Sequence, residues 1–199
     1  MVNVGNSFVA TPPIDGGVLH SADLGTLLPT KANTALAPAF LANDHGAVGE
    51  NGLGINKSRT TQKIRMFGGE TFREVQTEYD ESITVTLLED DLEAVLVSVF
   101  GEANVEVDEV EDDGLHKRIY HTSETLPIKS WILDAIDGEK TKRYVVEKGQ
   151  VTQTAEVTDV HSNVTNHQIT ITTYKSALGA KGENVLELRH DASVTSGNP

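Results

Sequence analysis

The stretch Ser82-Ile83-Thr84-Val85-Thr86-Leu87 decides the fold class, because its apolar side chains recur at every second residue. In an extended strand, successive side chains point to opposite faces, so Ile83, Val85 and Leu87 share one face and the hydroxyl residues share the other. The stretch therefore predicts a half-buried β-strand. One face is apolar and packs on a core, and the other is wet and lined by hydroxyl groups.

Strand-like segments recur between residues 60 and 174, and turn signals separate them. Gly68-Gly69 favours a turn, and Asp137-Gly138 is typical of a tight hairpin. Their number and spacing predict a mainly β protein. The segments are Thr60–Phe67, Thr71–Tyr79, Ser82–Leu88, Lys117–His121, Ser130–Ile136, Lys142–Val146, Val151–Val160 and His167–Tyr174.

One amphipathic helix is predicted at about residues 90–100. Asp90 and Glu93 have the spacing of a capping box, with Asp90 as the N-cap, and Gly101 suits the position just after the last turn. Apolar residues recur at the helical spacing, which indicates that one side packs on a sheet. These residues are Leu92, Val95, Leu96, Val99 and Phe100.

The pattern predicts a β-sandwich or partial barrel with one flanking α-helix, an extended N-terminal arm and long loops. We divide the chain into an arm and stacking loop at 1–58, a β domain at 59–190 and a loose tail at 191–199. The arm holds most of the prolines and little periodicity. Either it packs on a neighbouring subunit or it is a flexible terminus.

Composition excludes several classes of function. The 199 residues include no cysteine, which rules out disulfides, thiolate metal sites and cysteine nucleophiles. The formal net charge of −14 is the opposite of the basic stripe that duplex DNA binders carry, so nearby DNA is expected to be repelled. No signal peptide or membrane-spanning run is recognisable, and we expect a protein made in the cytoplasm.

No constellation of catalytic, cofactor or metal-binding residues is recognisable. The seven histidines lack helical i,i+4 pairing and an adjacent acid in a metalloprotease pattern, so we expect them at the surface or at interfaces. The glycines at 49, 52 and 54 lack the lysine and hydroxyl residue of a phosphate-binding loop. Trp131 lies in an apolar strand and is expected in the core. The sequence predicts neither an enzyme nor a cofactor.

A longer series of residues has a recognisable order and spacing, and it spans residues 45–175. It comprises Gly52-Leu53-Gly54-Ile55, Ser58–Ile64, Phe67-Gly68-Gly69-Glu70, Arg73-Glu74-Val75-Gln76-Thr77, Ser82–Glu89, Val99–Val105, Leu126-Pro127, Trp131, Asp134, Asp137-Gly138 and Gly149–Thr152. This series resembles the major tail proteins of actinobacterial siphophages.

The resemblance implies a tail tube subunit of a bacteriophage virion, assembled in the host cytoplasm and without a membrane partner. Subunits of that family form hexameric rings, which stack around a tape measure protein and meet a distal tail protein and a tail terminator. Genomic DNA passes through the channel at ejection without specific binding. Two alternatives remain: a tail completion protein that forms one ring on the same fold, or a β-sandwich binding module.

Two surfaces are candidates for assembly roles. We expect one face of the strand Glu70–Asp80 to line the channel, with a second candidate face on a later strand; the alternative is an outer wall or a seam between subunits. The channel candidates are Glu74, Gln76, Glu78 and Asp80, then Thr152, Thr154 and Glu156. A loop at 41–58 is expected to contact the next ring, and deleting Gly49–Gly54 should leave the fold intact but stop polymerisation. The inter-ring candidates are Gly49, Asn51, Gly52, Gly54 and Asn56.

Overall fold

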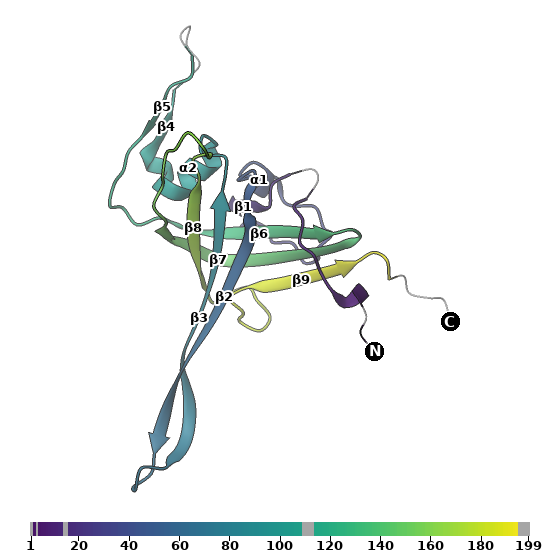
Figure 1. Ribbon diagram of the computed structural model, residues 1–199, viewed down its shortest axis with the longest axis vertical. Coiled ribbons are helices and arrows are strands. Elements are labelled where there is room, and N and C mark those ends of the chain that lie inside the picture. The colour runs from purple at the N-terminus through teal and green to yellow at the C-terminus, as the bar shows by residue number, and fades with distance from the viewer. Residues whose placement is uncertain (1, 3, 14–15, 109–113, 195–199) are drawn as a thin grey trace.

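The computed structural model describes residues 2, 4–13, 16–108 and 114–194. Among these residues the protein is mainly β, with one seven-stranded antiparallel sheet and one two-stranded ribbon (Figure 1). The large sheet has the order β1-β6-β7-β8-β3-β2, and β9 pairs with β7. The predicted mainly β fold with one flanking helix is confirmed.

The strands are β1 (Leu19–Ala22), β2 (Val48–Arg65), β3 (Thr71–Leu87), β4 (Val105–Val107), β5 (Lys117–Ile119), β6 (Ile128–Asp137), β7 (Lys140–Thr154), β8 (His167–Tyr174) and β9 (Leu186–Asp191). The helices are α1 (Pro38–Leu41) and α2 (Glu93–Phe100), with the 3-10 turns η1 (Val4–Asn6) and η2 (Glu102–Asn104). Strands β4 and β5 form the small ribbon.

Strand β7 joins the two parts of the large sheet. It pairs with β6 over residues 140–150, and its other edge pairs with β9 over residues 140–145 and with β8 over residues 148–154. In Figure 1, β6 and β7 run across the picture, whereas β2, β3 and β8 run along its long axis. The sheet therefore bends strongly, and the core lies inside the bend with α2 against it.

The core is built from the alternating apolar residues of several strands. Ile83, Val85 and Leu87 of β3 are almost fully buried, as the alternation predicts. Trp131 is also buried, which confirms its predicted place, and its indole N–H donates to the carbonyl oxygen of Gly149 at 2.9 Å. The other buried members of this cluster are Leu19, Val95, Leu133, Val146, Val151, Ile169 and Ile171.

The N-terminal arm lies along strand β6 of its own chain. Strand β1 pairs with β6, from Leu19 opposite Leu133 to Ala22 opposite Ser130. Farther out, Thr11 and Ile136 exchange two backbone hydrogen bonds of 2.8 and 2.9 Å. These described residues of the arm thus lie along the edge of the sheet, whereas residues 48–58 of the predicted arm belong to β2. Packing of the arm on a neighbouring subunit stays a prediction.

A buried ion pair fixes the segment that follows β1. Arg143 on β7 forms two hydrogen bonds of 2.7 Å with the carboxylate of Asp134 on β6, and its third nitrogen donates to the carbonyl oxygen of Thr34. Both charged side chains are nearly inaccessible to water. Such a pair is costly to break, because removing one partner leaves the other charge buried without compensation.

Helix α2 begins later than predicted. Leu92 is its N-cap and makes no side-chain capping hydrogen bond, so the predicted cap at Asp90 is wrong. Gly101 follows the last turn with φ of 92°, and its N–H donates to the carbonyl oxygen of Val97, which confirms the predicted end. The helix is therefore shorter than residues 90–100.

The predicted loop at 41–58 is wrong for its second half, because β2 begins at Val48 and continues to Arg65. Strand β2 thus crosses the boundary that we placed between residues 58 and 59. The predicted segments Thr71–Tyr79 and Ser82–Leu88 are one strand, β3. The turn at Gly68-Gly69 joins β2 to β3, and both glycines have positive φ. The acidic residues at 109 and 111–113 and the last five residues of the predicted tail lie outside the described residues.

Candidate assembly surfaces

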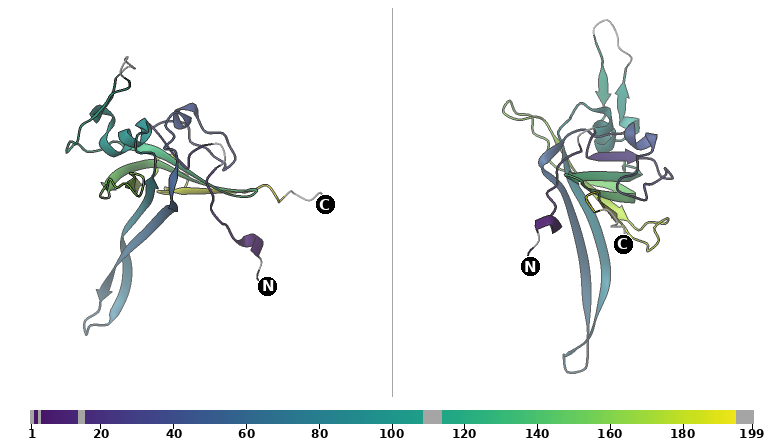
Figure 2. Two further views of the ribbon diagram at one scale, coloured as in Figure 1. Left: turned by 45° about the horizontal axis from the view of Figure 1, so that its top comes forward. Right: turned by 90° about the vertical axis from the view of Figure 1, so that its right-hand side faces the viewer.

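A long hairpin formed by β2 and β3 leaves the body of the protein. Only residues 81–87 of β3 pair with β8, so the outer part of the hairpin has no third strand (Figures 1 and 2). Between Asn56 and Asp80 every residue is exposed except the half-buried Val75 and Tyr79. We call residues 56–63 and 73–80 the hairpin shaft and residues 64–72 the hairpin tip. Neither has a core of its own.

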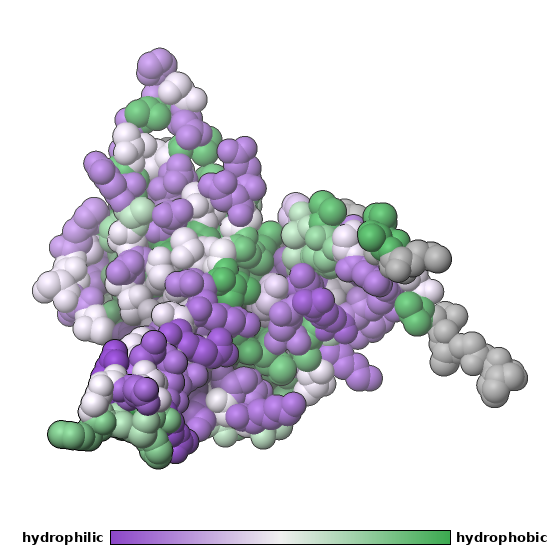
Figure 3. Space-filling model, turned by 60° about the horizontal axis from the view of Figure 1, so that its bottom comes forward, coloured by the Kyte–Doolittle hydropathy of each residue, from purple (hydrophilic) through white to green (hydrophobic). Residues whose placement is uncertain are grey.

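The hairpin tip is apolar although it is fully solvated. Phe67 and Phe72 are 110% and 70% exposed, and Ile64 and Met66 are about half exposed. Figure 3 shows these apolar residues gathered at the end of the hairpin, beyond a hydrophilic shaft. The turn is well ordered by hydrogen bonds: Met66 N–H donates to Glu70 O at 2.8 Å, and an Arg65 guanidinium nitrogen donates to Gly69 O at 2.7 Å.

A buried carboxylate anchors the root of the shaft. Glu81 is 3% exposed; one of its oxygens accepts a hydrogen bond of 2.9 Å from the Tyr79 hydroxyl, and the other lies 3.4 Å from the Lys57 ammonium. The guanidinium of Arg59 stacks over the Tyr79 ring, 4.8 Å from its centroid. Burial and the Glu81 carboxylate raise the pKa of Tyr79. These contacts fix the direction in which the hairpin leaves the sheet.

The predicted acidic face of the shaft is divided by a β-bulge at Thr77. Glu78 pairs with Thr60, but Gln76 pairs with Thr61, so Thr77 has no partner residue. Directly paired residues share a face, and neighbouring residues of β2 point to opposite faces. Glu78 and Asp80 therefore lie on one face of the hairpin. Gln76 and Glu74 lie on the other, where the Thr61 hydroxyl donates to Glu74 at 2.6 Å.

The face of the sheet opposite the core is lined by hydroxyl and amide groups. The hydroxyl oxygens of Thr84 and Thr170 are 3.4 Å apart, and those of Thr152 and Thr172 are 2.8 Å apart. We call this surface the hydroxyl face. Glu78 and Asp80 continue it onto the shaft, because they precede Ser82 at every second position of β3 and therefore point to the same side. Its residues are Asn56, Ser82, Thr84, Thr86, Gln150, Thr152, Gln168, Thr170 and Thr172.

The second predicted channel face is also divided by a bulge. Val151 pairs with Ile171, but Gln153 pairs with Thr170, so Thr152 is the extra residue. Thr152 lies on the hydroxyl face, whereas Thr154 pairs with Ile169 and lies on the core side of the sheet. Glu156 is beyond the end of β7, which ends at Thr154. The structure thus brings together three of the seven channel candidates: Glu78, Asp80 and Thr152.

The inter-ring candidates lie on β2, not on a loop. Val48 pairs with Leu87 and Leu53 pairs with Val85, so residues 49–52 face the single residue Thr86 as an irregular bulge. Gly54 and Asn56 are in regular pairing. Leu53 packs against the core, and deleting Gly49–Gly54 would remove it. The expectation that this deletion leaves the fold intact is therefore withdrawn, while the exposed members of the set stay candidates for contact.

Three histidines are buried, contrary to the expected surface positions. His45 is inaccessible, with its ring nitrogens 3.2 Å from Leu19 O and 2.7 Å from the Ser98 hydroxyl. Burial is the largest effect on its pKa, which is lowered to about 4 although the hydrogen bond to Leu19 O opposes it. His20 and His167 are 5% and 4% exposed. Distant partners bury these rings, so no local sequence signal marks them.

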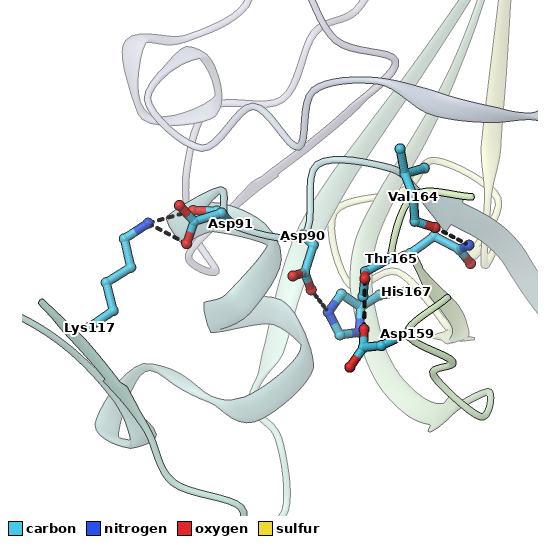
Figure 4. Close-up of polar contacts among 8 residues, drawn as sticks. Asp90, Asp91, Lys117, Asp159, Val164, Thr165 and His167 are labelled. Atoms are coloured by element: carbon cyan, nitrogen blue, oxygen red, sulfur yellow. Dashed lines mark hydrogen bonds and ion pairs between the residues drawn. The ribbon is translucent and has the colours of Figure 1, made fainter. Parts of the chain in front are cut away.

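Two polar contacts hold the start of α2 and the ribbon (Figure 4). The ring of His167 on β8 lies 2.6 Å from the carboxylate of Asp90, the residue that we had predicted as the helix cap. The next residue, Asp91, accepts hydrogen bonds from the Lys117 ammonium through its carboxylate and its carbonyl oxygen. Strand β5 is thereby joined to the beginning of the helix. Sequence reasoning did not identify either pair.

Within the described part of the chain, no group of three or more histidine, aspartate or glutamate side chains could hold a metal ion. No helix there is long and apolar enough to cross a membrane. The arrangement offers surfaces for contact, and these are the hairpin tip, the free strand edges and the hydroxyl face.

No protein-family model matches the chain, and no curated protein matches it. Among solved structures, the chain is similar to one described as the cryo-EM structure of the anti-feeding prophage cap (AFP tube terminating cap). The identity is 12% and the TM-score is 0.42, over 96% of this chain and 100% of that chain. A likeness this weak carries no argument about function. The candidate function therefore depends on the chain's own surfaces and on the sequence resemblance.

Proposed function

We propose that this protein is a structural subunit of a bacteriophage tail tube. Copies associate into hexameric rings, and the rings stack into a hollow tube around a tape measure protein. A distal tail protein and a tail terminator close the two ends, and genomic DNA passes through the channel without specific binding. The subunit has no catalytic role in this proposal.

The β2–β3 hairpin is the observation that carries the proposal. A two-stranded ribbon without a third strand or a covering layer is marginally stable in water. This one continues for about ten residues per strand beyond the sheet, and it ends in four exposed apolar side chains. Exposed apolar groups at the end of a projecting element are typical of an interaction site. This geometry supports the proposal that neighbouring copies complete the subunit.

Free strand edges give further support. The sheet order leaves the outer edge of β2 without a partner among the described residues, and the shaft part of β3 is also open. Unpaired edges of this length favour association with other chains unless something covers them. Closing several sheets into a ring would satisfy the edges, and a barrel with more strands encloses a wider channel.

The hydroxyl face has the chemistry that a DNA channel needs. Its threonine, serine and amide side chains are partly exposed and uncharged, so they offer a phosphate backbone no cation to bind. The cation at its border, Lys148 opposite Tyr174, lies 3.9 Å from the Glu147 carboxylate. Glu78 and Asp80 add negative charge at the shaft end, and like charge disfavours binding of DNA. We place this face toward the channel and the core side of the sheet away from it.

Electron microscopy of the purified protein in negative stain over a concentration series tests the proposal. Long hollow tubes built of stacked rings are the expected result. Isolated rings at every concentration would favour the alternative, a tail completion protein that forms one ring. A protein that stays monomeric at high concentration would refute the assembly proposal and favour a β-sandwich binding module.

A further inference from the structure

The exposed apolar hairpin tip needs a binding site, and one pocket on the body of the protein complements it in apolar lining and charge. We propose that the hairpin tip of one copy inserts into the pocket between the segment at 27–30 and the loop at 176–186 of a second copy. This inference rests on the proposed function and names the residues of one contact within the assembly. We call this pocket the socket.

The tip cannot be folded back onto its own chain. At about 3.3 Å per residue, the part of β2 from residue 56 to residue 65 extends roughly 30 Å beyond the sheet. Pairing with β3 holds this part extended apart from register shifts at Thr60/Thr61 and Ile64/Arg65, and it points away from β9 and the loop before it (Figures 1 and 2). Only a second copy can therefore bring a socket to this tip.

The socket has the size and lining to hold an aromatic side chain. Its volume is about 400 Å³, within the range of about 300–1,000 Å³ that small-ligand pockets occupy. Leu27, Leu178 and Leu186 are 82%, 72% and 39% exposed around it, so its rim is apolar as well. The remaining apolar lining comes from Leu28, Pro29, Val145 and Ala180. Burying Phe67 there would remove two exposed apolar surfaces from water at once.

Charge decides which pocket fits the tip. The segment from Lys63 to Arg73 carries three bases and one acid, although the whole chain carries 16 bases and 30 acids. Among the described residues, the socket wall includes the carboxylates of Glu147 and Glu183 and no lysine or arginine. The hairpin tip itself carries one base and one acid, Arg65 and Glu70, and two further bases, Lys63 and Arg73, flank it. An apolar tip flanked by bases and an apolar pocket with carboxylates in its wall are complementary, and this complementarity favours the pairing.

The socket's carboxylates are held in place before any contact forms. Glu147 accepts hydrogen bonds from the Ser176 hydroxyl and from the Leu178 N–H, the latter at 2.9 Å. Burial alone would raise the pKa of Glu147, but these hydrogen bonds and a third from Ala177 outweigh it and lower the pKa. Glu183 accepts from the Lys181 N–H at 3.0 Å. The ammonium of Lys148 lies 3.9 Å from Glu147 and offsets part of its charge. The socket wall is thus pre-organised, with Glu147 ionised at neutral pH.

A second apolar pocket fits less well. It lies between the N-terminal arm and the bulge of β2, and its volume is about 410 Å³. The ring of Phe8 already lines it, and the ammonium of Lys142 lies 4.1 Å from the centroid of that ring. The wall also carries Glu50 and Asp134, and Asp134 is paired with Arg143. Because Phe8 and Lys142 already occupy this wall, the pocket is the poorer partner.

The contact is of the heterologous kind, because the tip and the socket are different parts of the surface. Each copy that donates a tip keeps its own socket free for another copy. Such contacts produce closed rings or open filaments according to the rotation between copies, in contrast to the self-limiting pairs of a symmetric dimer. The proposed contact can therefore propagate through an assembly.

Disulfide trapping tests the contact directly, because the chain has no native cysteine. Two separate variants, Phe67→Cys and Leu178→Cys, are mixed under mild oxidation and resolved on a non-reducing gel. We expect a disulfide dimer between them at a yield at least tenfold above that of a control pair, Phe67→Cys with Val194→Cys, because Val194 and Leu178 are 73% and 72% exposed. The double variant in one chain should give a ladder of multimers. All three positions changed here are exposed, and circular dichroism verifies the folds.

Microscopy of the wild-type protein separates the two proposals. If tubes or rings form but Phe67 and Leu178 do not crosslink above the control pair, the tip-and-socket contact is wrong and the assembly proposal survives. If the crosslink forms in a protein that never builds rings, the contact is supported and the tail tube proposal fails. Absence of both crosslink and assembly overturns both.

Discussion

The indole N–H of Trp131 donates to the carbonyl oxygen of Gly149, and the same indole leaves no room for a side chain on that glycine. A Cβ atom on Gly149 would lie 2.7 Å from Trp131 Cδ1 and 2.8 Å from Ile171 Cγ2. The place where β6, β7 and β8 meet therefore depends on a glycine for its packing, at the centre of the bent sheet.

Gly149→Ala should lower the free energy of unfolding by about 1–3 kcal/mol, the usual range for overpacking a dense core. Urea titration followed by Trp131 fluorescence measures it. Gly54→Ala on β2 is the matched control, because its Cβ would lie 3.6 Å or more from Thr84, an ordinary contact. We expect the control to change stability by less than about 1 kcal/mol. Equal stability of both variants and the wild type would contradict this account of the core.

The contact between Asp90 and His167 predicts energetic coupling between a loop and a strand that are far apart in sequence. Asp90→Ala should cost about 1 kcal/mol, a modest value because the carboxylate is 47% exposed. In a His167→Gln background the same change should cost nearly nothing, and a double-mutant cycle measures the difference. If Asp90 stabilised the protein as a helix cap, Asp90→Ala would lower the free energy of unfolding equally with His167 and with glutamine at that position. An equal loss would therefore support the capping role that the sequence predicted.

Burial of His45 predicts a loss of stability in mild acid. Its pKa is lowered to about 4 in the folded state, against 6.5 without burial. Between these values the unfolded chain binds a proton that the folded chain does not, so stability falls as the pH drops from 6.5 to 4 and this loss is complete below 4. From pH 7 to pH 5 the contribution is about 2 kcal/mol.

His45→Gln is the variant for this prediction, because glutamine keeps polar atoms near Leu19 O and the Ser98 hydroxyl but does not titrate in this range. Urea titrations at pH 7 and pH 5 should show a smaller drop for the variant than for the wild type, by about 2 kcal/mol. Parallel losses in the two proteins would mean that other groups cause the acid sensitivity.

The local features of the fold were predictable because the residues that determine them are close together in the chain. The alternation from Ser82 to Leu87 needs only one strand and one core. The turns at Gly68-Gly69 and Asp137-Gly138 need only the positive φ that glycine adopts freely. Gly101 ends α2 for the same reason. Each of these predictions is confirmed in the structure.

The division of the channel candidates between two faces of the sheet was not predictable, because the position of a β-bulge depends on the pairing with the neighbouring strand. Counting in twos along β3 puts Glu74 and Glu78 on one face, and only the register against β2 reveals the extra residue Thr77. The same holds for Thr152 and Thr154 on β7. Asp90 has the local sequence context of a helix cap, but its carboxylate instead contacts the ring of His167, 77 residues away.

Because of the bulge at Thr77, Glu78 and Gln76 lie on opposite faces of the hairpin. If one of these faces lines the channel, the two positions should differ in accessibility after assembly. Glu78 lies on the hydroxyl face, which we propose as the channel wall, and Gln76 lies on the other face of the same strand. In assembled tubes, a cysteine at Glu78 should react with a small maleimide that diffuses along the channel. It should be protected from a bulky polymer-linked maleimide, which the closed wall excludes.

Glu78→Cys and Gln76→Cys, each in the cysteine-free chain, are labelled before and after assembly and compared by mass shift. Both positions are exposed in the free subunit, so both reagents should label both variants there. After assembly, selective loss of bulky labelling at Glu78 is expected if the hydroxyl face lines the channel. Bulky labelling that persists at Glu78 but is lost at Gln76 would place the hydroxyl face on the outside of the tube, and the channel would then be lined by the face that carries Glu74.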